Sequence, residues 1–333
     1  MRRFLSAQPW LAPIVGASAW ERIASLAGAI PSGWCWAGVE VRLGEGDGRV
    51  DLAVGWLAGE RGRLARAFAS GARVAAPQEL EEQVAGWEQR LAPVEGVCLE
   101  YDGCSASAPV VFWALDPGAI AGAPLEERLL EEMLVRDPGV RRTLLDTSAA
   151  LESAGGRPLH VASLEPRGFP FARLVAMVST EALAGVLERA RWPGDFVSLE
   201  DGLLTRVAAV GRWVQVHLTC GRDGLRGDAA VELYAPSNRH AQPLWSEVLG
   251  DLEDAGLCTS GRRRQLLGWL YDAGAGADGR ALDRRMYVKL SLAPGGGVSS
   301  AKAYLGVSSL GYFAAQRPGS PGALPRPWAG ART

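Results

Sequence analysis

Polar and apolar residues alternate along short stretches of this chain, and these stretches come in pairs. Alternation with a period of two is typical of strands that bury one face. The loops within the pairs are rich in Gly, Pro and Asp, which suits antiparallel hairpins. The predicted strand pairs are 36–43 with 49–56, 97–102 with 109–115, 159–164 with 172–178, 213–220 with 228–234, and 286–292 with 298–305.

Segments with helical spacing separate the hairpins, so hairpins and helices alternate along the chain. Ten antiparallel strands close most economically into a barrel, because closure leaves no bare sheet edge and helices can cover the outside. We therefore expect an α+β fold, an antiparallel ten-stranded barrel in one domain over residues 1–315, with a flexible tail over 316–333. The predicted helices span 18–27, 60–69, 77–91, 124–136, 138–151, 180–191, 198–210, 240–254 and 260–272.

The fifth hairpin gathers polar residues on one face. Counted back from a four-residue loop over 294–297, its register pairs Ala293 with Val298. The same register sets three polar pairs opposite each other: Tyr287 with Tyr304, Lys289 with Lys302, and Ser291 with Ser300. Two facing ammonium groups repel each other, and a multiply charged anion such as a diphosphate would remove the conflict. The simpler alternative is a solvated outer face that carries two unrelated lysines.

The other hairpins add candidate groups to the polar face. His217 and Glu232 fall on polar positions of the fourth hairpin. Glu40 and Glu100 do so on the first and second, although either could simply be solvated. Arg173 opens an apolar run in the third, where a guanidinium is costly to bury without a partner. A barrel with polar and aromatic inward positions is not filled by its own core, so we predict a chamber for a ligand.

Lysine is rare in this chain, which sets the two lysines apart from the other basic residues. Lys and Arg together number 35, of which only Lys289 and Lys302 are lysines. A coding bias towards Arg explains that ratio but not why both lysines lie on one hairpin. The 37 acidic residues bring the net charge to −2, which argues against a general nucleic-acid surface. No apolar run is long enough to cross a bilayer, so we expect neither nucleic acid nor membrane as a partner.

The cysteines and histidines suggest no further chemistry of their own. The five cysteines lack a CxxC pair and the three histidines form no ligand array, so neither a disulfide framework nor a metal site is predicted. Two N-terminal arginines, an apolar stretch and Ala17-Ser18-Ala19 loosely imitate a signal peptide. Pro9 and Pro13 interrupt that stretch, so we interpret the protein as cytoplasmic.

One local pattern resembles a known family. Lys302-Ala303-Tyr304 looks like the Lys-x-Tyr strands of the ABBA-type, or PT-barrel, prenyltransferases, and Tyr287-Val288-Lys289 precedes it. Glu232-Leu233-Tyr234 departs from the pattern, with Glu in the place of Lys. The order of hairpins and helices over most of residues 18–312 is similar to that family, which includes aromatic, indole and cyanobactin-like peptide prenyltransferases. The resemblance implies transfer of an isoprenyl group from an allylic diphosphate to an aromatic or peptide side-chain acceptor.

The resemblance also implies roles for individual residues. In that family, Lys and Arg on the inner wall hold the diphosphate, tyrosines shield the allylic cation, and an early-strand carboxylate orients the acceptor. The residues in matching places are Lys289, Lys302 and Arg173, with Arg49 or Arg42, for the diphosphate; Tyr234, Tyr287 and Tyr304 for the shield; and Glu100, or less readily Glu40, to orient the acceptor or take its proton. His217 is a further catalytic candidate from its place on the polar face alone. Fixed positive charge favours ionisation of the donor, and aromatic faces stabilise the cation. The chain has no DDxxD motif, so no cofactor is expected beyond the isoprenyl diphosphate co-substrate, and magnesium is not indicated although it could accompany that diphosphate.

Two other functions are compatible with the pattern. The first is a barrel that binds a peptide or small ligand without catalysis. The second is a pentein-like enzyme that modifies guanidines, which requires a nucleophilic Cys with a His partner. Cys258 lies beside a helical stretch and no His follows it, so this second alternative fits the sequence less well.

Overall fold

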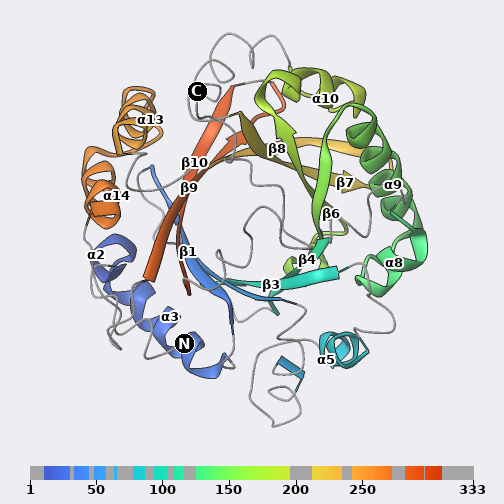
Figure 1. The fold of residues 1–333 in the computed structure, drawn as a ribbon, viewed down its shortest axis with the longest axis horizontal. Helices are drawn as coiled ribbons and strands as arrows, with labels where there is room; N and C mark the ends of the chain where they lie inside the picture. Colours follow the sequence, from blue (N-terminus) through green and yellow to red (C-terminus); the bar gives the residue numbers. More distant parts are fainter. Residues whose placement is uncertain are drawn as a thin grey trace, which may run out of the picture.

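The computed structural model describes residues 11–30, 34–44, 49–57, 64–65, 78–86, 94–103, 108–115, 125–195, 212–234, 242–271, 282–295 and 297–309. Within these ranges, ten strands form one closed antiparallel barrel, in which consecutive strands are neighbours and β1 pairs with β10 (Figure 1). This confirms the predicted fold class. The strands are β1 (Trp36–Arg42), β2 (Val50–Leu57), β3 (Val94–Asp102), β4 (Val110–Leu115), β5 (Arg157–Ser163), β6 (Ala172–Ser179), β7 (Trp213–Gly221), β8 (Gly224–Tyr234), β9 (Leu282–Leu292) and β10 (Val298–Ser309).

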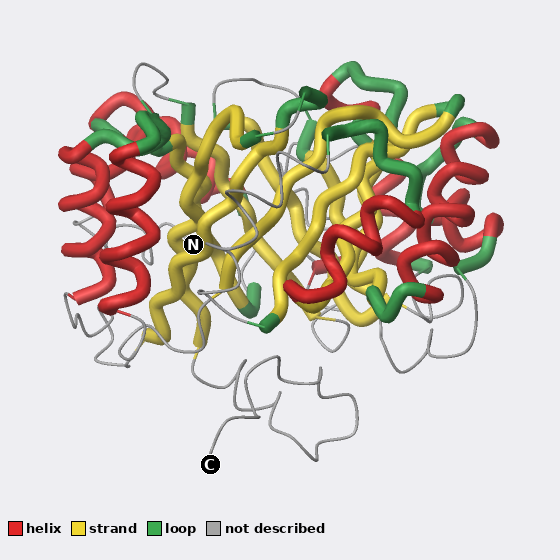
Figure 2. The backbone as a smooth tube through the Cα atoms, turned by 90° about the horizontal axis from the view of Figure 1, so that it is seen from above, coloured by secondary structure: helices red, strands yellow, loops and turns green. Residues whose placement is uncertain are grey.

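Helices surround the barrel and lie on its outside (Figures 1 and 2). α9 packs on β5, β6 and β7, and α14 packs on β9 and on the N-terminal helix α2. The described helices are α2 (Leu11–Val15), α3 (Ala17–Ala29), α5 (Gln78–Ala85), α8 (Glu127–Glu132), α9 (Pro138–Ser153), α10 (Leu183–Arg189), α13 (Gln242–Asp254) and α14 (Ser260–Tyr271), with short 3₁₀ turns at Glu165–Arg167 and Thr180–Ala182. No helix in the described ranges has the length and apolarity needed to cross a bilayer.

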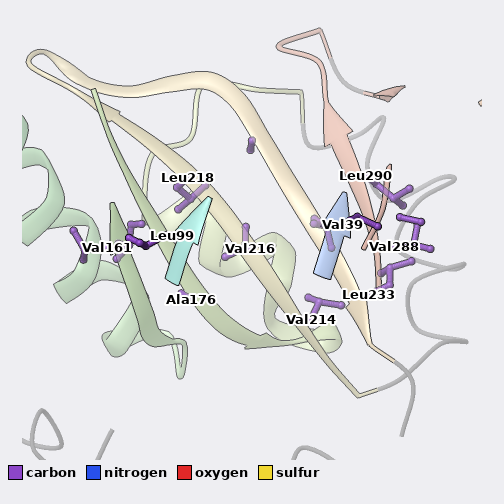
Figure 3. Packing of buried hydrophobic residues seen from close by; sticks show 14 of the residues in the cluster. Val39, Leu99, Val161, Ala176, Val214, Val216, Leu218, Leu233, Val288 and Leu290 are labelled. Carbon is purple, nitrogen blue, oxygen red and sulfur yellow. The ribbon is translucent and has the colours of Figure 1, made fainter. Parts of the chain in front are cut away.

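The main hydrophobic core lies between the barrel and these helices. Alternate strand residues such as Val39, Val216 and Val288 are buried in one apolar cluster, part of which Figure 3 shows, together with residues of the surrounding helices. Trp113 of β4 contributes to this layer and donates from Nε1 to the carbonyl of Met133 at 3.1 Å, so its polar atom is satisfied. Because side chains alternate across a strand, the residues between these apolar positions face the inside of the barrel.

Local sequence determines where the best-defined helix begins. Asp137 caps α9 by accepting the backbone N–H groups of Gly139 and Val140 at 2.8 and 3.2 Å. Pro138 occupies the first turn, where its missing N–H costs nothing. Arg222 in the β7–β8 turn holds the second Asp137 oxygen at 2.5 Å, so the cap also ties the helix to the barrel.

The structure corrects the loop of the fifth hairpin. Val298 pairs with Leu292 rather than with Ala293, and a bulge between Val298 and Ser300 absorbs the extra residue. Beyond this bulge the register returns to the predicted one. A one-residue bulge next to the loop therefore changed the turn without moving the lysines to opposite faces.

The N-terminal apolar stretch that loosely imitates a signal peptide is folded over residues 11–15. Leu11, Ile14 and Val15 of α2 are buried in the main core, and Gln265 of α14 donates to the carbonyl of Pro13 at 3.1 Å. The predicted helix over 198–210 and the predicted tail over 316–333 lie outside the described residues. Of the predicted helix over 60–69, only residues 64–65 are described.

Candidate active site

The two central lysines face each other on the inner side of the barrel. Lys289 of β9 is paired directly with Lys302 of β10, and Tyr287 is paired with Tyr304 one step along. Val288 belongs to the outer apolar core, so its neighbour Lys289 projects to the opposite face. Lys289 is 6 % exposed. The predicted register is thus confirmed, and the alternative of a solvated outer face is wrong.

Carboxylates on the adjoining strands already accompany both lysines. Glu40 of β1 accepts from the Lys302 Nζ at 2.5 Å, and Glu232 of β8 is paired directly with Lys289. Lys289 also donates to the Tyr304 hydroxyl at 3.4 Å. Burial alone would raise the pKa of Glu40, but the ammonium groups of Lys302 and Lys289 outweigh it and lower that pKa to about 2. The sheet therefore offsets the repulsion between the lysines with its own carboxylates.

The Lys289 ammonium remains the less stabilised of the two. Burial, followed by the positive charge of Arg173, lowers the pKa of Lys289 from 10.5 to about 8. The attraction of Glu40 and Glu232 opposes this effect without cancelling it. An anion that reached Lys289 would consequently favour its charged form.

A second ion pair reaches the inner face from a hairpin loop. Arg167, at the end of the 3₁₀ turn between β5 and β6, binds Glu100 of β3 with Nη2 and Oε1 at 2.6 Å. The Asp51 carboxyl lies close enough to Glu40 and Glu100 for their negative charges to affect its pKa. Burial and the repulsion of these two carboxylates raise the pKa of Asp51 to about 6. This side of the inner face is therefore acidic, and Arg167 neutralises part of it.

His217 lies in a separate polar group with Glu232 and Tyr234. The His217 Nε2 and Glu232 Oε2 are 2.9 Å apart, and the Tyr234 hydroxyl donates to the other Glu232 oxygen. Burial, and then the nearby charges of Lys289 and Arg173, lower the pKa of His217 well below its ordinary 6.5. The imidazole is therefore neutral at neutral pH.

The three predicted arginines lie in different environments. Arg42 ends β1 and is paired directly with Lys302. Arg173 of β6 faces the barrel interior, and its Nη2 donates to the Thr219 hydroxyl at 3.4 Å. Thr219 in turn donates to Asp228 at 3.0 Å. Arg49 precedes β2 at the hairpin end and is exposed, so the structure does not place it with the buried charges. Arg49 lies outside the strand, so the alternation of the barrel wall does not direct its side chain inward.

Aromatic and apolar side chains complete the inner face. The rings of Tyr234 and Tyr287 lie 4.3 Å apart between centroids, so they pack against each other across β8 and β9. The Lys289 ammonium lies 5.7 Å from the centroid of the Tyr304 ring. An apolar cluster separate from the outer core occupies another part of the inner face and comprises Val110, Phe112, Ala162, Leu164 and Val175, with Cys98 and Phe171 packed against it. The inner face therefore offers both charged and apolar contacts.

Two important groups were not assigned a role from the sequence. Arg167 contacts Glu100 across 67 residues of sequence, and no local pattern signals this contact. Glu232 was placed on the polar face and noted as a departure from the Lys-x-Tyr pattern, but it was given no role, although it contacts His217 and pairs with Lys289. The departure itself was the signal, because an acid among inward cations requires a partner.

Comparison with solved structures finds proteins that share this fold. The chain is similar to 6-dimethylallyltryptophan synthase from Micromonospora olivasterospora in complex with DMASPP and Trp, with a TM-score of 0.59 and 15 % identity over 93 % of this chain and 97 % of that chain. It is also similar to the prenyltransferase PriB in its apo form, with a TM-score of 0.54 and 16 % identity over 94 % and 97 %. For NotF in complex with brevianamide F and DMSPP, the TM-score is 0.52 with 12 % identity over 92 % and 90 %.

These similarities concern three-dimensional structure. No family model matches the sequence, and no curated protein matches it significantly. At 11–16 % identity the likeness shows the fold alone. The chain has the PT-barrel fold that the ABBA prenyltransferases share.

Proposed function

We propose that this protein is a prenyltransferase that moves an isoprenyl group from an allylic diphosphate to an aromatic or peptide side-chain acceptor. The observation that carries this proposal is the facing pair of the buried Lys289 and the partly buried Lys302, next to the pair of Tyr287 and Tyr304, on the inner face of a PT barrel. Cations beside aromatic faces are what ionisation of an allylic diphosphate requires.

In this proposal the donor diphosphate binds against Lys289, Lys302 and Arg173. Arg173 lies close enough to Lys289 to lower the pKa of its ammonium, so the two charges act on the same region. The leaving group gains negative charge as the bond to carbon breaks, and fixed cations stabilise it without reorganisation. Tyr234, Tyr287 and Tyr304 then surround the allylic cation and exclude water from it.

The acceptor would lie towards the apolar inner cluster and Glu100. Val110 is paired directly with Glu100 in the β3–β4 register, and Phe112 with Cys98 two residues along, so an aromatic ring could pack there while its N–H donates to the carboxylate. Arg167 holds Glu100 in place at 2.6 Å and keeps its charge compensated. We propose positioning of the acceptor, rather than proton removal, as the role of Glu100.

Binding without catalysis is the second candidate, and one observation favours it. Glu40 already binds Lys302, so a diphosphate must compete with a carboxylate of the protein itself. The pentein-like alternative loses its nucleophile, because Cys258 is packed in the main core and its pKa is raised, first by burial, to about 11.

The test combines donor binding with product formation. The native protein is incubated with a panel of isoprenyl diphosphates and aromatic or peptide acceptors, and mass spectrometry records the mass gained by each acceptor. Calorimetry measures the binding of a non-reactive thiolodiphosphate donor. The double variant Lys289→Ala, Lys302→Ala should lose donor binding, while Arg142→Ala, Arg189→Ala removes two exposed cations as a matched control. Unchanged donor binding in the lysine variant would refute the site, and donor binding without any mass gain would favour the non-catalytic barrel.

A further inference from the structure

The polar group around His217 has the internal order of a catalytic dyad. Glu232 binds the His217 Nε2 at 2.9 Å with one oxygen, and it accepts the Tyr234 hydroxyl with the other. Both side chains of the dyad are about 8 % exposed. A buried carboxylate whose two oxygens are both engaged holds the imidazole in one orientation and one tautomer.

The other nitrogen of this imidazole is available. The His217 Nδ1 is buried and has no hydrogen-bond partner among the described residues. An ionised Glu232 can only accept, so it selects the tautomer with the hydrogen on Nε2, which leaves the lone pair on Nδ1. A buried, unpaired acceptor costs free energy, so its retention next to an orienting carboxylate points to use by a ligand.

Two other carboxylates of the inner face, Glu40 and Glu100, are less suited to accept a proton. Glu40 is held ionised by Lys302 and is a weak base for that reason. Glu100 is engaged by Arg167 at 2.6 Å. Asp51 accepts the backbone N–H of Gly103 at 3.4 Å, where β2 meets the hairpin end. Burial and the nearby carboxylates raise the pKa of Asp51 to about 6, so Asp51 is the competing candidate that an experiment must separate from His217.

We propose that His217, oriented by Glu232, accepts through Nδ1 the proton that the acceptor loses when the new bond forms. This inference rests on the proposed prenyl transfer. The allylic carbon–oxygen bond breaks and its electron pair leaves with diphosphate, and the acceptor atom supplies the pair for the new bond to carbon. The proton released from that atom goes to Nδ1, and the Glu232 carboxylate stabilises the imidazolium that results.

The charges that face His217 come from several strands. Lys289 on β9 and Arg173 on β6 disfavour the imidazolium, as does His160 on β5, whereas Glu40 on β1 and Glu232 on β8 favour it. Diphosphate binding at Lys289 and Arg173 would cancel the two strongest unfavourable charges. The donor would thus strengthen the base that completes its own transfer.

A first test follows the tautomer directly and does not need turnover. The chain contains three histidines, so ¹⁵N-histidine labelling gives a simple spectrum, and His217→Gln assigns the signals of His217. We expect a hydrogen on Nε2 and none on Nδ1 at neutral pH. A hydrogen on Nδ1, or an imidazolium in the protein without donor, would overturn the proposal.

A second test measures the chemistry with an acceptor found for the native protein. His217→Gln should keep thiolodiphosphate affinity and lower kcat by about 100-fold or more. With an acceptor deuterated at the reacting atom, it should show a primary isotope effect that the native protein lacks, because proton removal becomes rate-limiting. His160→Gln, a matched loss of an inward imidazole, should show no such effect. The kcat of Glu232→Gln should lie between that of the native protein and that of His217→Gln.

The outcomes separate this proposal from the one on which it rests. If the native protein forms no product with any acceptor, prenyl transfer fails and the catalytic role of His217 fails with it. If the native protein is active and His217→Gln keeps its kcat without an isotope effect, the dyad alone is refuted. An isotope effect that arises in Asp51→Asn but not in His217→Gln would assign the proton to Asp51 instead.

Discussion

Replacement of Lys302 by Met tests how the buried charges of the barrel are balanced. The Lys302 side chain is 18 % exposed and that of Glu40 is 4 % exposed, so removal of the ammonium leaves a carboxylate largely without water. Met keeps the length and the apolar stem of Lys. The change therefore isolates the loss of charge rather than the loss of packing.

The pKa of Glu40 sets the expected magnitude. Its lowering from 4.5 to about 2 corresponds to roughly 3 kcal/mol in favour of the charged carboxylate, at about 1.4 kcal/mol per pKa unit, and, against the effect of burial, it comes from Lys302 first, with Lys289 and Tyr304. Removal of one member of a buried ion pair typically costs about 3–5 kcal/mol. We expect the free energy of unfolding of Lys302→Met to fall by about 3 kcal/mol at pH 7.

The sign of the pH dependence follows from the same shift. Glu40 has a lower pKa in the folded protein than in the unfolded chain, so its stabilising contribution is complete above pH 4.5 and disappears as the pH falls to about 2. The difference in stability between the native protein and Lys302→Met should shrink over that pH range. Urea unfolding followed by tryptophan fluorescence at several pH values measures it.

Two further variants control the result. Lys302→Met combined with Glu40→Gln removes both charges and should recover most of the lost stability. Lys289→Met removes the facing lysine, which donates a hydrogen bond to Tyr304 and whose charged form is disfavoured by burial. This change should lower the free energy of unfolding by about 1 kcal/mol or less. A loss below about 0.5 kcal/mol in Lys302→Met, or a double variant as unstable as the single one, would refute the reasoning.

Three other measurements test the structure at different points. The affinity for the thiolodiphosphate should fall as the pH rises through about 8, because Lys289 loses its proton there. Calorimetry at pH 7 and pH 9 measures this, and equal affinities at the two pH values would contradict a contact between Lys289 and the diphosphate. Asp137→Ala should lower the free energy of unfolding by about 1 kcal/mol through loss of the α9 cap, with Asp137→Asn as the milder control. Arg167→Met should raise KM for the acceptor more than it changes donor affinity, since Arg167 holds Glu100; equal effects on both substrates would contradict that role.

The fold was predictable from sequence because most of the barrel strands alternate between apolar and polar residues. Apolar residues such as Val216 and Val288 face the helices outside the barrel. Because side chains alternate along a strand, the polar residues between them must face the barrel interior. Register followed as well, since Lys289 and Lys302 lie close together on one hairpin, where a short loop limits the choices. The bulge at Val298 was not predictable, because a loop of Gly and Pro allows several turn geometries of nearly equal energy.

The partners of the candidate site residues were harder to predict than their faces. Glu40 and Lys302 are 262 residues apart in sequence, and Glu100 and Arg167 are 67 apart. Such contacts depend on which strands are neighbours around the closed barrel and on how hairpin loops fold back, and neither is encoded in local alternation. His217 and Glu232, in contrast, lie on one hairpin at diagonal positions, so their contact could have been inferred from the register of β7 and β8.

Closure of β10 on β1 also governs when the site can exist during synthesis. The first strand, β1, pairs with the last, β10, and this pairing brings Glu40 next to Lys302. This ion pair therefore forms only after the ribosome has synthesised all ten strands. Contacts between such distant residues fold slowly, and until then β1 presents an unpaired edge. A chain that stopped before β10 would therefore retain an exposed edge and an unneutralised carboxylate, and we expect it to aggregate or be degraded rather than to bind its ligand weakly.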